Sequence, residues 1–460
     1  MVEHQRFVGW RVGQLPGAES VPATSYQDGP SYQEGAMRTG EAARHHRVLQ
    51  LFERNVLAAK QAGLARIRVS DASLDGGVIT VDGRRVLNFG SCAYLGLNVD
   101  ERLKQGAIEA INRFGPVFSS STAYTSVDLY TELEERLKRI FEATVILPTT
   151  TTLGHLAALP VLIGAGDVVL VDSQAHASVH LATQSLKALG IPVTPLAHND
   201  LAALEAAVVA PPGEAGRIWY LADGVYSMFG DVAPVTQIVA LLDRYPRLHA
   251  YIDDAHGFGW CGRNGRGYVL SQTPLHARLV VAVSLAKSFG SGGAALVFPD
   301  ERSARRVQMV GSTLTFSGPI HPAELGAAVA SADIHLSAEL SERQARLVAQ
   351  IDLVLETLSV GRLPVPAFAR TPIWYARIGS QANAVEVGRR MLRDGFYLNV
   401  ALFPAVPLGE AGLRFTQTLY HTDDQVLSMV EMLTHHVLEV TGKTEVIVDL
   451  DQVSADEVTA

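Results

Sequence analysis

The segments AYIDDAHGFGWCGRNGRG (residues 250–267) and VVAVSLAKSFGSGGAAL (residues 280–296) determine the predicted fold. Each contains a short apolar run of strand length that continues into small and polar residues. Asp253 ends the first run, and Lys287 follows the second. Both side chains would be costly to bury without a partner, so core packing alone does not explain them. The alternative is that Asp253 and Asp254 cap a turn and that Lys287 is an ordinary solvated lysine.

Similar apolar runs alternate with amphipathic helical stretches on both sides of these segments. They include DVVLVD (167–172), IWYLAD (218–223) and AALVFP (294–299). This alternation predicts an open α/β sheet, and such sheets bind ligands at the carboxyl ends of their strands. Asp172 and Asp223 end two of the runs, while Asp253 and Ser284 end the two central ones. We therefore expect the functional site at this edge of the sheet.

The composition narrows the class of protein. The 460 residues are 48% hydrophobic, enough for a large core and two or three domains. The 38 basic and 47 acidic residues provide no basic field, so nucleic acid is not an expected partner. No apolar run reaches membrane-spanning length and the N-terminus lacks a signal-peptide pattern, so we expect a cytoplasmic protein. Cys92 and Cys261 are too few for a disulfide framework or a thiolate zinc site.

The chain is expected to consist of five parts. They are a flexible arm (1–40), a helix and hairpin segment (41–90), a large domain (91–330), a small C-terminal domain (331–442) and an acidic tail (443–460). The hairpin should turn at Asp82 and Gly83. A long helical stretch is expected from about residue 321 to 358, followed by strands in the small domain.

An aspartate at the end of a buried strand, together with a lysine after the next strand, suits pyridoxal 5'-phosphate. This cofactor accepts electrons only while its ring nitrogen is protonated, which a buried carboxylate ensures, and it binds a lysine amine. Residues 252–257 read I-D-D-A-H-G, and residues 284–290 read S-L-A-K-S-F-G. They resemble the V-D-[ED]-A-H-[GS] and [ST]-x-[SG]-K-[AG]-[FL]-G signatures of the α-oxoamine synthase family, over about residues 88–421. The resemblance implies a fold-type I α/β transferase fold, like that of aspartate aminotransferase, with a large, mostly parallel central sheet and a smaller C-terminal α+β domain.

The resemblance also implies roles for the residues around the cofactor ring. Lys287 would hold the cofactor as a Schiff base, and Asp253 would bond the pyridine nitrogen. His256 would form a hydrogen bond with the phenolic oxygen. Ser227, in DGVYSMFGDVAP, would belong to the environment of the same oxygen.

His176, in DSQAHAS, resembles the family imidazole that stacks on the pyridine ring. A metal pair formed by His176 and His180 at helical spacing is the alternative. The glutamate of an H-E-x-x-H site is absent and the sequence suggests no third ligand, which favours stacking.

The cofactor phosphate needs hydroxyl and backbone N–H donors, which a helix N-terminus supplies. Thr151 and Thr152 precede a predicted helix where the family has a Ser-Gly-Tyr or Ser-Gly-Phe turn, although an N-cap cluster is the alternative explanation. Ser284 matches the family's phosphate-binding hydroxyl. Ser317, in Phe316-Ser317-Gly318, occupies the place of a family contact that comes from the neighbouring subunit. The resemblance therefore implies a homodimer with shared active sites.

The substrate residues follow the family less closely. Arg414 lies in a V-P-x-G-x-x-x-L-R stretch whose arginine would bind the amino acid carboxylate, and a surface arginine is the alternative. Cys92 replaces the asparagine of the family's S-N-x-Y-L-G stretch. Residues 115–122 replace a glycine-rich loop with a serine-rich one. Altered substrates are expected.

The resemblance implies a decarboxylative condensation of an α-amino acid with an acyl thioester, carried by coenzyme A or by an acyl carrier protein, to an α-amino ketone. Lys287 would remove the α-proton. Transamination or chemistry on S-adenosylmethionine, using the same cofactor, is the alternative. A non-catalytic partner subunit is a third hypothesis, which the presence of Lys287, Asp253 and His256 disfavours.

Overall fold

The computed structural model describes residues 32–211, 216–360, 363, 365–366 and 369–442. The chain divides into two units, residues 1–53 and 54–460. In the first unit, the described residues are the beginning of helix α1 (Tyr32–Gln61). The helix starts before the predicted position at Glu41, so the last part of the predicted arm is helical. Residues 32–40 lack apolar periodicity but include the good helix formers Glu, Ala, Met and Arg. The rest of the arm and the acidic tail lie outside the described residues.

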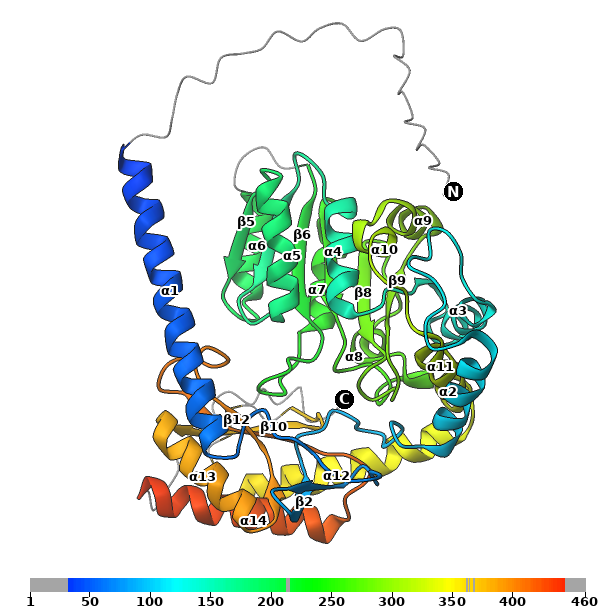
Figure 1. Cartoon of the computed structure of the whole chain (residues 1–460). Helices are drawn as coiled ribbons and strands as arrows, with labels where there is room; N and C mark the ends of the chain where they lie inside the picture. The colour runs from blue at the N-terminus through cyan, green and yellow to red at the C-terminus, as the bar shows by residue number, and fades with distance from the viewer. Residues whose placement is uncertain (1–31, 212–215, 361–362, 364, 367–368, 443–460) are drawn as a thin grey trace, which may run out of the picture. The chain divides into compact units, whose positions relative to one another are not determined.

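A seven-stranded sheet forms the centre of the large part of the second unit (Figure 1). Its strand order is β3-β9-β8-β7-β6-β4-β5, and β9 runs antiparallel to the other six strands. The strands are β3 (Thr144–Ile146), β4 (Val168–Asp172), β5 (Val193–Leu196), β6 (Ile218–Asp223), β7 (Leu248–Asp253), β8 (Leu279–Ser284) and β9 (Ala294–Phe298). The predicted mostly parallel sheet is therefore confirmed.

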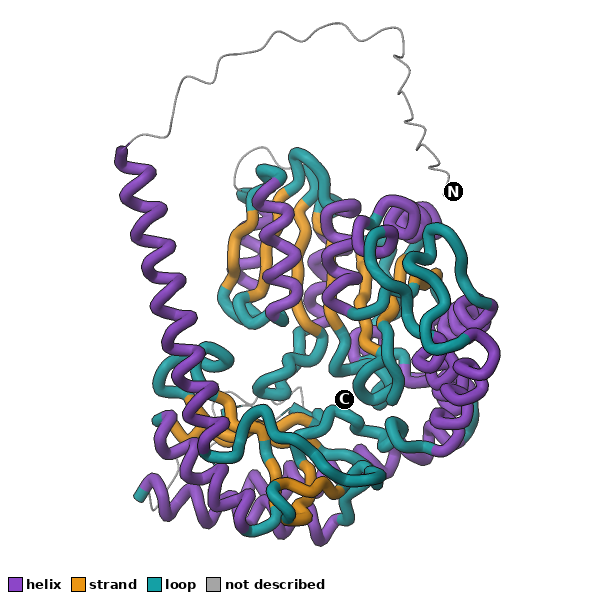
Figure 2. Tube along the Cα trace, viewed as in Figure 1, coloured by secondary structure: helices purple, strands orange, loops and turns teal. Residues whose placement is uncertain are grey.

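Helices cover both faces of this sheet (Figure 2). Along β4, Val168 and Leu170 enter one core cluster with α3, α6, α7 and α11, while Val169 and Val171 enter another with α4, α5 and α9. Burial on both faces explains why these strands are continuous apolar runs in the sequence. The helices and short helical turns of this part are α2 (Glu101–Phe114), α3 (Asp128–Phe141), α4 (Thr151–Leu162), α5 (Ala177–Ala188), α6 (Leu201–Val209), α7 (Val235–Arg244), η1 (Arg263–Gly265), α8 (Tyr268–Gln272), α9 (Glu301–Val310), α10 (Ser312–Thr315) and α11 (Pro322–His335).

The predicted helical stretch over about residues 321–358 consists of two helices in the structure, α11 and α12 (Glu339–Val360). Near the break, the Ser337 hydroxyl donates to the carbonyl oxygen of Ile334, and the backbone N–H of Ser337 bonds the same carbonyl. Serine competes in this way for backbone groups that would otherwise continue the helix. The apolar pattern runs on across the break, so periodicity did not reveal it.

The C-terminal part contains a second sheet, of order β10-β13-β12. Its core cluster also includes residues of the large part, such as Val225 and Trp260. Its further elements are β10 (Ile373–Gly379), α13 (Gln381–Arg393), β11 (Phe396–Tyr397), β12 (Asn399–Ala401), β13 (Ala411–Thr416) and α14 (Asp423–Thr441). The predicted hairpin, β1 (Val78–Val81) and β2 (Arg84–Asn88), is confirmed, with Asp82 and Gly83 in the turn at φ values of 48° and 76°. Strand β2 also pairs in parallel with β11, so the hairpin belongs to a sheet with C-terminal residues.

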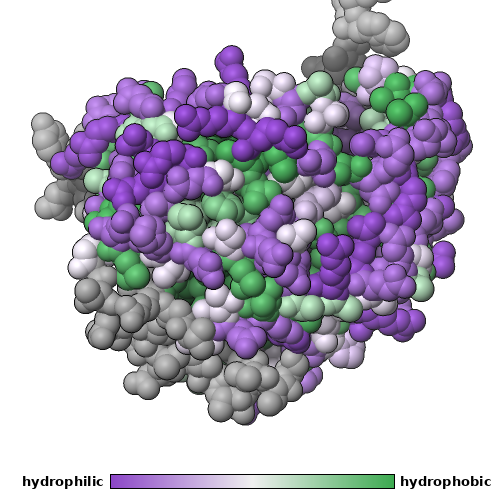
Figure 3. Space-filling model, turned by 90° about the horizontal axis from the view of Figure 1, so that it is seen from below, coloured by the Kyte–Doolittle hydropathy of each residue, from purple (hydrophilic) through white to green (hydrophobic). Residues whose placement is uncertain are grey.

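Among the described residues, no helix combines the length and apolar character needed to span a membrane. Seen from below, the molecule carries hydrophilic residues along much of its surface, with hydrophobic residues between them (Figure 3).

Candidate active site

A cavity of about 180 Å³ lies at the carboxyl ends of β6, β7 and β8, beside the N-terminus of α4. The sequence predicts the functional site at this edge of the sheet. The predicted site residues in its wall are Thr151, Thr152, His176, Asp253, His256, Ser284 and Lys287. Those outside its wall are Cys92, Ser227, Ser317 and Arg414.

Asp253 is the buried carboxylate of the cavity, with 4% of its surface exposed. Its Oδ1 accepts a hydrogen bond from the backbone N–H of Ala255, and its Oδ2 lies 3.0 Å from Nε2 of His155. Burial by itself would raise the pKa of Asp253. The hydrogen bond from His155 and the charges of His155 and Lys287 outweigh burial and lower this pKa to about 2. Asp253 is therefore ionised at neutral pH.

His155 is a functional residue that the sequence analysis missed. It is fully buried in α4, and its Nδ1 lies 2.8 Å from the hydroxyl of Tyr251. A single histidine in the apolar run LGHLAAL has the pattern of a core residue. Its partners lie 96 and 98 residues away in the chain, so no local spacing could have identified it.

His176 is held in place by the neighbouring strand β6. Its backbone N–H donates to Oδ1 of Asp223 at 2.9 Å, and its Nδ1 lies 2.7 Å from the hydroxyl of Ser178. Desolvation and the charge of Lys287 lower the pKa of His176, although Asp253 acts in the opposite sense. Burial and the charge of Asp253 raise the pKa of Asp223 well above its usual range. The hydrogen bond from its backbone N–H to Asp223 fixes the backbone of His176, from which the imidazole extends.

The N-terminus of α4 provides unused donors at the other end of the cavity. Thr150 is the N-cap, because its hydroxyl oxygen accepts a hydrogen bond from the backbone N–H of Leu153. The Thr149 hydroxyl donates to the carbonyl oxygen of Gly318. Within the described part of the chain, the hydroxyls of Thr151 and Thr152 have no partner, and backbone N–H groups of a first helical turn have no intrahelical acceptor. The N-cap explanation thus applies to Thr150 and leaves Thr151 and Thr152 for an anion.

Arg414 forms a second cluster close to the cavity. It extends from β13, and 7% of its surface is exposed. Its Nε donates to the carbonyl oxygen of Ser227 at 2.5 Å, and a terminal guanidinium nitrogen lies 3.8 Å from Sγ of Cys92. Among the described residues, no carboxylate forms an ion pair with this guanidinium. A buried cation without a counter-ion is costly, so this position suits a carboxylate from outside the chain. Its charge also contributes to lowering the pKa of His256, after burial and Lys287.

Comparison with known proteins agrees with this geometry. A family model described as aminotransferase class I and II matches residues 84–432. The 8-amino-7-oxononanoate synthase of Geobacter sulfurreducens is 32% identical over 374 residues, which cover 80% of this chain and 93% of that protein. The chain belongs to the α-oxoamine synthase family.

Solved structures support the fold of this family member. The serine palmitoyltransferase of Sphingomonas wittichii matches with a TM-score of 0.76 at 25% identity, covering 85% of this chain and 97% of that one. A structure of SPT with PLP as internal aldimine matches with a TM-score of 0.77 at 23% identity and the same coverage. The predicted fold-type I architecture, with its large sheet and smaller C-terminal domain, is confirmed.

Pyridoxal phosphate, the cofactor of this family, fits the groups in the cavity. The ionised carboxylate of Asp253 suits a protonated ring nitrogen, and the amine of Lys287 suits an aldehyde. The open N-terminus of α4 suits a phosphate. Each functional part of the cofactor therefore has a complementary group in one cavity.

Ser317 is not in the cavity wall of its own chain, although the carbonyl oxygen of its neighbour Gly318 accepts a hydrogen bond from Thr149, which is in that wall. Ser317 is half-buried, and the preceding Phe316 is 87% exposed. Ser317 therefore lies near the phosphate end of this cavity without lining it.

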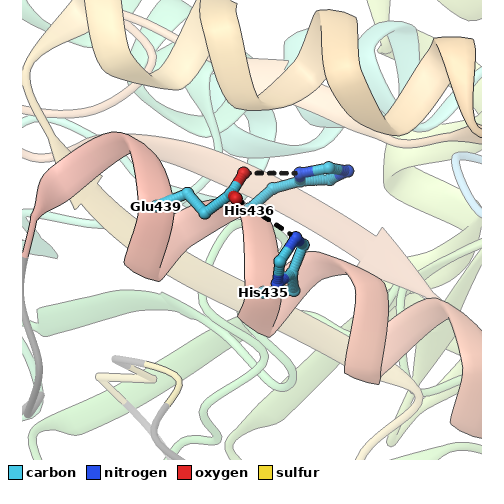
Figure 4. A group of neighbouring side chains, drawn as sticks. All are labelled: His435, His436 and Glu439. Atoms are coloured by element: carbon cyan, nitrogen blue, oxygen red, sulfur yellow. Dashed lines mark ion pairs between the residues drawn. The ribbon is translucent and has the colours of Figure 1, made fainter.

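A separate group of possible metal ligands lies on α14 (Figure 4). Among the described residues, His435, His436 and Glu439 are the group of three whose ligand atoms lie close together. Glu439 is already paired with Arg390 at 2.9 Å, and His436 with Asp394 at 2.6 Å. His176 and His180 belong to no such group in the described chain, so the geometry gives the metal alternative no third ligand.

Proposed function

We propose that this protein condenses an α-amino acid with an acyl thioester, with loss of carbon dioxide, to form an α-amino ketone. The observation that carries the proposal is one cavity in which Lys287 and an ionised, buried Asp253 face the same space. The guanidinium of Arg414, which forms no ion pair within the described part of the chain, lies close by and gives an amino acid carboxylate a binding position.

The cofactor would be held at three points. Lys287 would bind its aldehyde carbon, Asp253 would keep its ring nitrogen protonated, and Thr151, Thr152 and Ser284 would bind its phosphate together with the first N–H groups of α4. Bound in this way, pyridoxal phosphate supplies an electron sink for the carbanion that the substrate must form. His155 would keep Asp253 charged throughout, because its hydrogen bond favours the ionised carboxylate.

Other residues would orient the substrate and the cofactor ring. Arg414 would bind the amino acid carboxylate, and Cys92 would border that carboxylate because its sulfur lies beside the guanidinium. The amine of Lys287 would then accept the α-proton. His176 would cover one face of the ring, and His256 would bond the phenolic oxygen. Ser227 stays a prediction for the same oxygen, although its carbonyl oxygen accepts a hydrogen bond from Arg414.

A homodimer with shared sites would bring in Ser317 from the second subunit. Exposed apolar side chains near this residue support the proposal: Val117, Phe118, Tyr124 and Phe316. The hydroxyl of Ser121 donates to the carbonyl oxygen of Thr315, which joins the loop of the first three to Phe316. The predicted division between a large domain (91–330) and a small domain (331–442) has support from their separate sheets.

The experiment incubates the purified protein and pyridoxal phosphate with each amino acid of a panel. Acyl-coenzyme A and acyl carrier protein carrying an acyl group are tested as thioesters in separate reactions. Consumption of thioester with release of carbon dioxide and formation of an aminoketone is the expected result, and the active arm identifies the acyl carrier. Conversion of an amino acid to its keto acid without thioester consumption would instead show an aminotransferase.

A further inference from the structure

The hydroxyl of Tyr94 lies 2.7 Å from Nδ1 of His256 in the interior of the protein. Tyr94 is 0% exposed and lies between β2 and α2, two residues after Cys92. His256 is in the cavity wall, whereas Tyr94 is not. Tyr94 therefore contacts the imidazole from the side away from the cavity.

This contact leaves one ring nitrogen of His256 for the cavity. Nδ1 is occupied by Tyr94, and Nε2 has no hydrogen-bond partner among the described residues. The backbone of His256 is fixed as well, because its carbonyl oxygen accepts a hydrogen bond from Nε1 of Trp260 at 2.7 Å. The ring therefore has little freedom to exchange the positions of its two nitrogens.

The protonation states on each side of this contact follow from its surroundings. Burial and the charges of Lys287 and Arg414 lower the pKa of His256 well below its usual range, so the imidazole is neutral and carries one proton. Burial is the main reason that the pKa of Tyr94 is raised well above its usual range, so the phenol keeps its proton. Either Tyr94 donates to Nδ1, or Nδ1–H donates to Tyr94.

Arg414 favours the first of these two arrangements. A terminal nitrogen of its guanidinium lies 3.8 Å from Sγ of Cys92, two residues before Tyr94. Both Cys92 and Arg414 affect the pKa of Tyr94, and the guanidinium can only donate. When the tyrosine oxygen accepts from that side, its own hydrogen is free for Nδ1 of His256. Nε2 then carries the imidazole proton and directs it into the cavity.

We propose that Tyr94 is a positioning residue that donates to Nδ1 of His256 and thereby holds Nε2–H toward the phenolic oxygen of the cofactor. The inference rests on the proposed function, because it assigns His256 to that oxygen. It adds that Tyr94 determines which tautomer of His256 faces the cofactor.

The first test is Tyr94→Phe, which removes one oxygen atom and preserves the ring. Without its partner, His256 can present a lone pair to the phenolic oxygen, so we expect the Kd for pyridoxal phosphate to rise about tenfold. We also expect the pH midpoint of the bound cofactor's absorbance to move. Tyr130→Phe is the matched control, because it removes another buried tyrosine hydroxyl, which bonds the backbone N–H of Ile320 outside the cavity.

A double-mutant cycle tests whether Tyr94 acts through His256. If it does, Tyr94→Phe should add little to the Kd of His256→Gln, since the two residues act as one unit. Independent effects that multiply would overturn the proposal. A Tyr94→Phe protein with wild-type Kd and midpoint would overturn it too, while the proposed function would stand.

A measurement on the wild-type chain covers the case in which Tyr94→Phe does not fold. The ¹⁵N chemical shifts of His256, assigned by their loss in His256→Gln, report its tautomer directly. Protonation at Nε2 supports the proposal, and protonation at Nδ1 overturns it. A wild-type protein that binds no pyridoxal phosphate at all would overturn both this inference and the proposed function.

Discussion

Two histidine–carboxylate networks lie at the carboxyl edge of the same sheet and differ in what they face. In the first, Asp253 at the end of β7 lines the cavity while His155 holds it from within the core. In the second, His198 lies between Asp172, at the end of β4, and Asp231, at distances of 2.9 and 2.5 Å. Neither carboxylate of the second network is in the cavity wall.

This difference distinguishes a histidine–carboxylate network that takes part in chemistry from one that only stabilises the fold. Burial would lower the pKa of His198, but its bonds to Asp172 and Asp231 raise it to about 9, so one imidazolium lies between the two carboxylates. Asp253 keeps its negative charge beside open space and the amine of Lys287. A buried ionised group therefore indicates function where it adjoins a cavity, and stability where it faces only other groups of the protein.

Asp253→Asn carries the largest expected effect. An amide cannot keep the pyridine nitrogen protonated, so the cofactor should still bind while kcat falls about 1,000-fold, as when one preorganised electrostatic contact is lost. Absorbance of the bound cofactor and steady-state kinetics measure the two quantities. The matched control is Asp172→Asn, which should keep most of its kcat because this carboxylate faces no cavity. Equal losses of kcat in the two variants would contradict the functional difference between the two networks.

His198→Gln tests the second network. Removing one partner leaves buried carboxylates without their counter-charge, so the free energy of unfolding should fall by about 3 kcal/mol. Denaturant titration measures it, with kcat of the folded variant expected to stay near wild type. His435→Gln, at a histidine whose side chain is 59% exposed, is the control and should change little. A large loss of kcat without a loss of stability would assign the second network to catalysis.

The same network should make the stability of the folded protein depend on pH, with a smaller effect than the loss of His198. Because the pKa of His198 is raised in the folded protein, from a usual 6.5 to about 9, its stabilisation is complete below pH 6.5 and is lost as the pH rises toward 9. Melting curves between pH 6 and 9.5 should therefore show a decline that His198→Gln lacks. A decline of the same size in both proteins would mean that another group titrates.

His155→Asn carries the smallest expected effect. Its hydrogen bond and charge oppose the effect of burial on Asp253, so their loss should raise the pKa of Asp253. The acid limb of the kcat profile should move to higher pH, with about a tenfold loss near its midpoint and little change at pH 8. Tyr251→Phe, which removes only the outer partner of His155, should shift the limb less. An unmoved limb would show that His155 does not control Asp253.

The sequence predicted those parts of the molecule that local patterns determine. Strands β4, β6, β7 and β8 are apolar runs because both faces of the sheet are covered, and Asp253 and Lys287 stand in recognisable segments. Strands β3 and β5 were not predicted, because they are short strands at the two edges of the sheet.

Contacts between distant segments set the limit of prediction in the site. The bond from His155 to Asp253 and the bond from Tyr94 to His256 join residues 98 and 162 positions apart. Similarly, the sequence placed Ser227 near the cofactor through its side chain, whereas the structure shows its carbonyl oxygen bonded to Arg414. Such pairings depend on how the elements meet in space.

The parallel pairing of β2 with β11 has a consequence for synthesis of the chain. In this region Asn399 donates to the carbonyl oxygen of Gly90, 309 residues earlier. During translation the hairpin leaves the ribosome long before its partner exists, and contacts of such separation form slowly. Until then β2 presents an unpaired edge, which is prone to pair with other chains. A nascent chain that stalls before residue 396 would therefore be a substrate for chaperones.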